Sequence, residues 1–294
     1  MKRYIFISIF LTCACLFGAN AQEKLRLDSL QNLLEGANQT DSVKYLMLIG
    51  EEYFISENYS KALDCFFPSL KLSEANNRLK GVADASNSIG RVYYNMENYE
   101  EGLIYFDKAL NYYDKINDEE GTGGVLNNLA LIYYEIDSID LAVENYQKAL
   151  KIKKRYDDKL DIAAIYHNLG LVYINQKNFA KGIENFVSSR KIFLELGYDK
   201  HATNTTNNIG RAYYRNAQYN EALDYFKIAL DEAIELSSSF LIMDNYKYQA
   251  DCYAKMGSYW KAYSFSKEYY SLKDSLLNLD KKKEIAEIQA KYEN

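Results

Sequence analysis

The sequence predicts an all-α fold, an α-solenoid of six helix-turn-helix units with a 40-residue period. Three observations support this prediction. The 294 residues include a single proline, although proline marks many turns in loop-rich and β-rich folds. Residues of one type recur every 40 positions without an insertion. Apolar residues follow the i, i+3, i+7 spacing of amphipathic helices, and an apolar content of 48% is sufficient for a packed core.

The first 21 residues have the features of a secretory signal peptide. Lys2 and Arg3 precede an apolar run that ends at Phe17, and a small-x-small cleavage pattern at residues 19–21 precedes Gln22. The run is shorter than the roughly 20 residues of a membrane-spanning helix, so an uncleaved anchor is the weaker alternative. Cleavage would change the net charge from −6 to −8, and no later stretch is apolar enough to span a membrane. We therefore expect a mature chain in the periplasm or outside the cell.

Columns of residues taken every 40 positions define the repeat. The first column is small, and it contains Gly50, Gly90, Ala130, Gly170, Gly210 and Ala250. Three positions later the column contains Tyr53, Tyr93, Tyr133, Tyr173, Tyr213 and Tyr253. A second small column contains Ala62, Gly102, Ala142, Gly182, Ala222 and Ala262. An aromatic column contains Phe66, Phe106, Tyr146, Phe186 and Phe226 and ends at Ser266. We expect small residues that face each other to let the two helices of a unit approach closely, with aromatic rings beside that contact.

Each unit is predicted to contain two helices. Leu46, Ile49 and Tyr53 form the apolar stripe of the first helix, and Ala62 and Phe66 begin the stripe of the second. Polar breaks separate the helices at residues 57–58, 97–98, 137–138, 177–178 and 257–258. Pro68 falls inside a predicted second helix, so that helix is kinked there or its boundary is misplaced.

The chain divides into four parts. We assign residues 1–21 to the signal peptide, 22–40 to an N-terminal capping helix, 41–277 to the six repeats and 278–294 to a charged C-terminal helix. The ends of a solenoid are expected to differ from its inner repeats because they cover its core.

The repeat columns resemble the tetratricopeptide repeat family. Gly50, Tyr53, Ala62 and Phe66 stand at the signature offsets of that family, whose tryptophan and closing proline are absent here. The segment 126–133 is similar to long-repeat members such as kinesin light chains and bacterial peptide-sensing regulators. The resemblance implies a right-handed superhelix in which the first helices line a concave groove. It also implies helices a few residues longer than in the usual shorter repeat.

A helical wheel indicates which residues line this groove. Positions 46, 49 and 53 fall on the core side of the first helix, and positions 44, 47, 48, 51, 54 and 55 fall on the opposite stripe. The predicted binding residues on this stripe are Asn87, Arg91, Asn127, Asn128, Tyr134, His167, Asn168, Asn207, Asn208, Arg211 and Tyr214. Asparagine is a poor helix former, yet it recurs in phase, and its amide can pair with the backbone of an extended peptide. The arginines suit acidic groups and the tyrosines suit apolar ones.

The asparagines have a second interpretation. They bond to neighbouring helices and fix the packing between repeats instead of binding a ligand. Both interpretations remain open for each asparagine, and the aromatic column at position 54 is better explained by packing.

Residues with catalytic chemistry are sparse. His167 lacks a cysteine or carboxylate partner at ligand spacing and is interpreted as a groove or packing residue, whereas His201 is expected to be solvated. The segment 121–124 resembles a phosphate loop, but no Gly-Lys-Ser/Thr follows it, and we expect a turn between repeats. Cys65 and Cys252 are expected to be free, partly buried thiols. We therefore predict no enzymatic activity, no metal and no cofactor.

The predicted partner is a protein or peptide. An excess of acidic residues, 41 against 35 basic ones, argues against nucleic-acid binding. The first hypothesis is an exported, non-catalytic scaffold that binds a peptide or protein segment in its groove. The alternative is an input module related to the repeat arrays of bacterial sensor kinases and transcriptional regulators, without the output domain.

Overall fold

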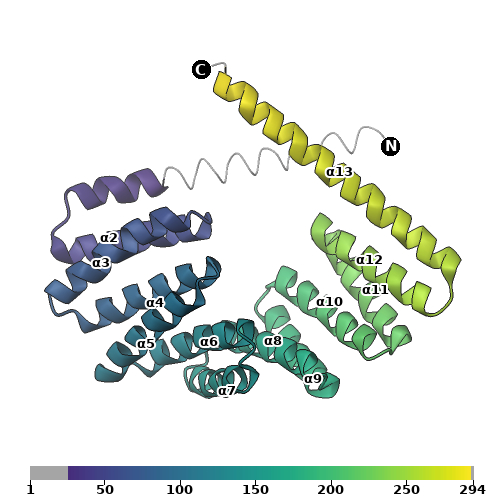
Figure 1. Ribbon diagram of the computed structural model, residues 1–294, viewed down its shortest axis with the longest axis horizontal. Coiled ribbons are helices and arrows are strands. Elements are labelled where there is room, and N and C mark those ends of the chain that lie inside the picture. Colours follow the sequence, from purple (N-terminus) through teal and green to yellow (C-terminus); the bar gives the residue numbers. More distant parts are fainter. Residues whose placement is uncertain (1–25, 293–294) are drawn as a thin grey trace. The chain divides into compact units, whose positions relative to one another are not determined.

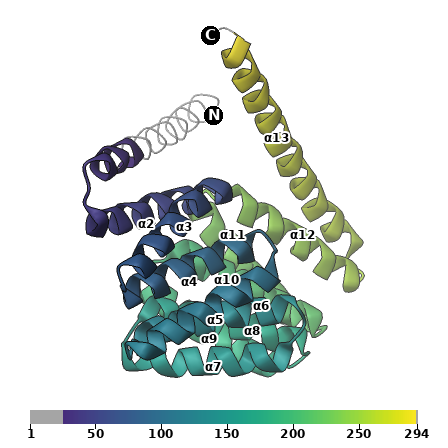
Figure 2. The same cartoon turned by 60° about the vertical axis from the view of Figure 1, so that its left-hand side comes forward.

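The computed structural model describes residues 26–292, and every regular element in that range is a helix (Figures 1 and 2). After a helix that covers residues 26–35, the elements are α2 (Gln39–Ile55), α3 (Tyr59–Ala75), α4 (Leu79–Asn95), α5 (Tyr99–Lys115), α6 (Glu119–Glu135), α7 (Ile139–Arg155), α8 (Lys159–Asn175), α9 (Phe179–Glu195), α10 (Asp199–Arg215), α11 (Tyr219–Glu235), α12 (Ser239–Lys255) and α13 (Tyr259–Tyr292). The predicted signal peptide lies outside the described residues. The prediction of an all-α solenoid is confirmed.

The chain forms two compact units, Met1–Ile152 and Lys153–Asn294. Within each unit, consecutive helices pack against one another, as α4 does on α5 and α8 does on α9. The helices α2 to α12 are each 17 residues long, whereas α13 continues for 34 residues. Each predicted repeat therefore contributes one helix pair.

Links of three residues separate the helices, which gives the chain a half-period of 20 residues. The middle residue of each link is left-handed, with φ between 51° and 75°, at positions 57, 77, 97, 117, 137, 157, 177, 197, 217, 237 and 257. In the first link the amide of Asn58 donates to the carbonyl of Tyr53 at 2.8 Å, and the amide of Glu57 donates to that of Phe54 at 3.0 Å. This pair of bonds ends a helix by capping its last carbonyls. The predicted polar breaks are confirmed.

A glycine of the first small column lies against a phenylalanine ring in four helix pairs. A Cβ atom placed on Gly90 would lie 2.6 Å from the ring of Phe106, and one on Gly170 would lie 2.5 Å from that of Phe186. The same arrangement joins Gly50 to Phe66 and Gly210 to Phe226. All four rings are at most 1% exposed. The first small column therefore makes room for an aromatic ring, as the sequence predicted.

The second small column brings the two backbones together. A Cβ atom on Gly182 would lie 3.2 Å from the carbonyl oxygen of Gly170, and one on Gly102 would lie 3.6 Å from that of Gly90. The expected close approach is confirmed for this column.

The turn predicted at residues 121–124 is wrong. These residues belong to the first turns of α6, and the link lies at residues 116–118. Asp118 caps the helix by accepting a hydrogen bond from the amide of Gly121 at 2.8 Å. A glycine is required at 121 because the ring of Tyr113 occupies the space of its side chain.

Pro68 lies inside α3, which continues through it as one helix. The predicted boundary was therefore correct. Pro68 and Asp64 are both accessible to solvent, so water can satisfy the Asp64 carbonyl that loses its intrahelical donor.

The residues before α2 contact that helix. Arg26 forms an ion pair with Glu52 at 3.1 Å, and Gln31 donates a hydrogen bond to the hydroxyl of Tyr53 at 3.3 Å.

We expect Gly170→Ala to destabilise the fold by about 1–3 kcal/mol, because the added methyl group overpacks against Phe186. Gly124→Ala is the matched control. This glycine also lies in a helix, but no atom lies within 4 Å of the position that its Cβ would take, so the same change should stabilise by about 1 kcal/mol. Denaturant unfolding of both variants measures the difference. Equal effects of the two substitutions would contradict the proposed role of the ring.

Candidate functional site

The predicted binding residues lie on first helices, and each unit is described by itself. In the first unit, α4 carries Asn87 and Arg91, and α6 carries Asn127, Asn128 and Tyr134. In the second unit, α8 carries His167 and Asn168, and α10 carries Asn207, Asn208, Arg211 and Tyr214.

Several of these side chains bond to the next first helix. In the first unit, Asn128 donates to the Oδ1 atom of Asn87 at 3.0 Å, and Arg91 forms an ion pair with Glu51 at 2.9 Å. In the second unit, Asn207 donates to Asp244 at 2.6 Å. These bonds match the packing interpretation, and they do not test whether the same residues also contact a ligand.

His167 is the centre of a directional chain of hydrogen bonds between α8 and α10. The Thr205 hydroxyl donates its only proton to the carbonyl of His201 at 2.8 Å, so the Nδ1 atom of His167, 3.0 Å from that hydroxyl, must be the donor. The Nε2 atom is then unprotonated and accepts from Asn208 at 3.3 Å. Arg211 in turn donates to the Oδ1 atom of Asn208 at 3.3 Å. The bonding pattern therefore fixes a neutral imidazole with one tautomer.

Burial, with a smaller contribution from the charge of His201, lowers the pKa of His167 to about 4. The neutral form that the hydrogen bonds require is thus the form present at neutral pH.

Two adjoining cavities lie along the first helices of the second unit. The larger has a volume of about 390 Å³ and is lined by Lys200, His201, Asn204, Ser238, Phe240 and Leu241. The smaller has a volume of about 200 Å³ and is lined by Ala164, His167, Asn168, Phe193, His201 and Asn204. His201 and Asn204 belong to both linings. We refer to these two adjoining cavities together as the recess; two of the predicted residues, His167 and Asn168, line it.

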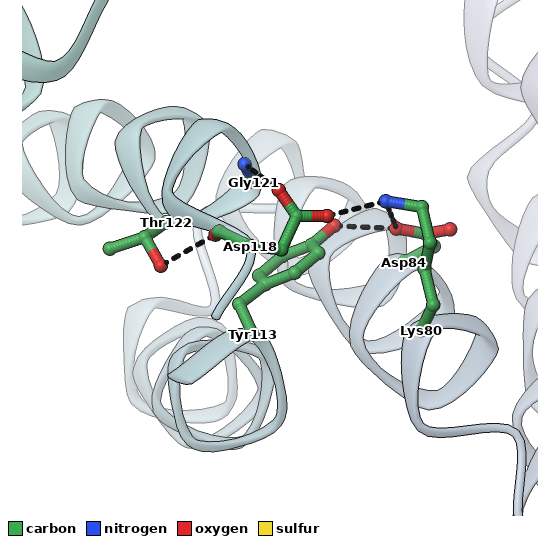
Figure 3. A network of polar contacts seen from close by, with 6 residues as sticks. All are labelled: Lys80, Asp84, Tyr113, Asp118, Gly121 and Thr122. Carbon is green, nitrogen blue, oxygen red and sulfur yellow. Dashed lines mark hydrogen bonds and ion pairs between the residues drawn. The ribbon is translucent and has the colours of Figure 1, made fainter. Parts of the chain in front are cut away.

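The equivalent positions in the first unit form a closed polar network instead (Figure 3). Lys80, 120 positions before Lys200, lies 2.5 Å from Asp118 and 3.9 Å from Asp84. Tyr113 donates its hydroxyl proton to Asp84 at 2.6 Å. These bonds link α4, α5 and the start of α6, so the side chains satisfy one another across the repeat junction.

Sequence reasoning missed three important residues of the recess. Asn204 is in the column of position 44, which the helical wheel placed on the groove-side stripe. The predicted binding residues were taken from other columns of that stripe, so Asn204 was not among them. Phe240 lies in the first turn of α12, before the column of position 44 at which the groove-side stripe began. Its side chain is 68% exposed. His201 was expected to be solvated, and it is exposed, but it also contacts Phe193 with 5.2 Å between ring centroids. A phenylalanine next to the start of a predicted helix was the signal available in the sequence.

The two predicted arginines have different surroundings. The charge of Arg91 is compensated by Glu51, whereas Arg211 is exposed and lies over the Tyr248 ring at 5.1 Å. Arg211 is not among the residues that line either cavity.

The thiols are free and buried, as predicted. Burial, together with a neighbouring aspartate in each case, raises the pKa of Cys65 to about 11 and that of Cys252 to about 12. Both thiols are therefore protonated at neutral pH. Among residues 26–292, no group of three or more His, Cys, Asp or Glu side chains is placed to hold a metal ion. In the same range, no helix combines the length and apolar character needed to cross a membrane.

The helix pairs and their groove-side stripe define a class of proteins built from stacked two-helix repeats. A tetratricopeptide repeat model matches residues 81–155 and 161–231. The chain belongs to the tetratricopeptide repeat family. No curated protein sequence matches it.

Solved structures share this fold at low sequence identity. One is a signal transduction ATPase with numerous domains from Pyrococcus horikoshii, which has a tetratricopeptide repeat sensor. It has a TM-score of 0.73 and 20% identity, over 91% of this chain and 42% of that one. A Rap protein in complex with competence and sporulation factor has a TM-score of 0.64 and 15% identity, over 85% and 80% of the two chains. BtubC from P. vanneervenii has a TM-score of 0.63 and 15% identity, over 74% and 91%. At these identities the likeness establishes the fold.

We expect the stability of the second unit to fall as pH decreases from about 6.5 to about 4 because of His167. The folded-state pKa is depressed, so the unfolded chain binds more protons in this window. The cost approaches about 3 kcal/mol near the lower limit and is absent above the upper one. In His167→Gln the titrating group is lost, so its unfolding free energy should depend less steeply on pH between these limits. Parallel pH profiles for the two proteins would contradict the buried neutral imidazole.

Proposed function

We propose that the chain is an exported, non-catalytic scaffold that binds an extended segment of a partner protein along the first helices of its second unit. The observation that carries this proposal is the recess formed by the two adjoining cavities. A recess of this size with a few polar groups is the usual form of a binding site.

The lining of the recess suits an extended polypeptide. Asn168 and Asn204 offer amide donors and acceptors for a peptide backbone, and Phe193 and Phe240 offer apolar contact for its side chains. Lys200 is an exposed cation in the lining of the recess, so it favours a segment that carries carboxylates.

Proteins of similar fold add support to this proposal. One solved Rap protein holds competence and sporulation factor, and the Rap conjugation regulator of plasmid pLS20 holds the Phr* peptide. These ligands belong to those proteins, and only the use of the fold for peptide binding is carried to this chain.

A sensor input module is the second candidate. The observation that favours it is the 34-residue length of α13, twice that of every other described repeat helix, because a continuous helix can transmit a change in the array to an attached domain. A sensor kinase or regulator encoded beside this chain would favour this candidate over the first.

Export is tested by the N-terminus of the mature protein. Expression of the full chain in a bacterium should yield protein outside the cytoplasm that begins at Gln22, because the residues before it form the proposed cleavage pattern. N-terminal sequencing of the exported fraction measures this. Intact protein that stays in the cytoplasm would contradict export.

Binding is tested with a partner identified by crosslinking in the native compartment and mass spectrometry. For a synthetic peptide from the crosslinked segment, Asn168→Ala combined with Asn204→Ala should raise the dissociation constant about tenfold or more, because both amides line the recess. The free energy of unfolding should change by less than about 0.5 kcal/mol.

Asn128→Ala is the matched control. It removes the bond to Asn87 between repeats of the first unit, so it should lower stability by about 1 kcal/mol and leave peptide binding to the second unit unchanged. The proposal fails if the recess variants lose stability while binding is retained, or if crosslinking recovers no partner.

A further inference from the structure

The outward face of α13 carries an exposed apolar stripe. Trp260 is 76% exposed, Tyr263 is 67% exposed, Tyr270 is 59% exposed and Leu277 is 50% exposed. Trp260 is the one tryptophan of the chain. Exposed aromatic residues at helical spacing mark an interaction surface on a soluble fold.

Part of this face is covered in earlier repeats, whereas the positions equivalent to Trp260 and Lys267 are exposed there too. Leu63 and Leu70 of α3, at the positions equivalent to Tyr263 and Tyr270, pack into a core cluster with Val82 and Ile89 of α4. In the second unit, Leu223 of α11 packs with Cys252 of α12 in the same way. Among the described residues, no later helix covers this face of α13, and an uncovered outer face of a solenoid is expected to be polar. The aromatic stripe of α13 therefore calls for an additional partner.

The spacing along this face fits a two-helix contact. Trp260, Tyr263, Lys267, Tyr270, Asp274, Leu277 and Lys281 are separated alternately by three and four residues, which is the spacing of the contact positions in a coiled coil. Lys267, Asp274 and Lys281 are all exposed.

We propose that this face binds the same face of a second copy of the chain, with the two α13 helices antiparallel and a two-fold axis close to Tyr270. In this register Lys267 of each copy faces Asp274 of the other, and Tyr263 faces Leu277. Trp260 faces Lys281, an arrangement that permits a cation–π contact. Tyr270 of one copy faces Tyr270 of the other. The seam is self-complementary, as a two-fold contact requires.

Charge selects the antiparallel orientation. In a parallel pair, Lys267 would face Lys267 and Asp274 would face Asp274, so every charged layer would be repulsive.

The area available fits a reversible dimer. Six exposed aromatic side chains, three from each copy, would bury about 800 Å² in this contact. With the leucines and lysine stems the interface reaches about 1,000 Å², the lower end for a specific complex. We expect dissociation in the micromolar range. This contact does not use the recess of the second unit, so its test is independent of the proposed function.

Sedimentation velocity of the full chain tests the proposal. The protein should change from monomer to dimer as its concentration rises through the micromolar range. Lys267→Glu places a glutamate opposite Asp274, and Asp274→Lys places a lysine opposite Lys267, so each variant alone should dimerise about 10- to 100-fold more weakly. An equimolar mixture of the two variants should recover the dimer, because both contacts between the copies then join opposite charges. The glutamate at position 267 of one variant faces the lysine at position 274 of the other, and Asp274 of the first faces Lys267 of the second.

Lys227→Glu is the matched control. This exposed lysine is the equivalent of Lys267 on α11, and its reversal should leave dimerisation unchanged. All substituted residues are exposed, and unchanged melting temperatures will confirm intact folding. A chain that stays monomeric at high micromolar concentration overturns the proposal. So does a dimer that is insensitive to both charge reversals, or a mixture in which no dimer is recovered.

Discussion

The contact between a glycine backbone and a phenylalanine ring fixes the geometry of the helix pairs. Because protein interiors are close packed, the ring of Phe106 or Phe186 has one place to lie, over Gly90 or Gly170. That contact sets the height at which the second helix crosses the first. Helices of 17 residues joined by three-residue links then repeat the arrangement. As a result, the side of each first helix that faces away from the ring is left to form the groove-side stripe.

The 40-residue period was predictable because this contact restricts residue type. Only a small residue fits beneath the ring, so the column stays small, and alanine replaces glycine where the partner is Tyr146 or Ser266. The 20-residue half-period was not predictable in this way. The left-handed link position is held by backbone bonds, and residues as different as Glu57 and Gly197 occupy it. This explains why the turn was wrongly placed at residues 121–124.

Contacts between successive repeats show why the site was predicted only in part. One position pair joins a second helix to the next first helix: Tyr113 lies against Gly121, Lys153 forms an ion pair with Asp161 at 2.5 Å, and the ring of Phe193 contacts His201. Each of these three pairs is complementary, but the residue types differ from one pair to the next. A residue type that recurs every 40 positions can be recognised from the sequence, and the recurring asparagines revealed the groove-side stripe in this way. Complementarity between two columns is visible only once the helices are placed, so the recess around His201 was missed.

The recess can be understood as the loss of that complementarity at one junction. Lys80, Asp84 and Asp118 combine a cation with two carboxylates, and they close the surface between α4 and α6. The equivalent columns in the second unit hold Lys200, Asn204 and Ser238, none of which is a carboxylate. No ion pair can form among these three, so the lysine and the amide remain available to an incoming group. The substitutions leave the contact between Gly210 and Phe226 intact. A repeat can therefore exchange surface bonds for binding capacity without losing the packing that holds its helices together.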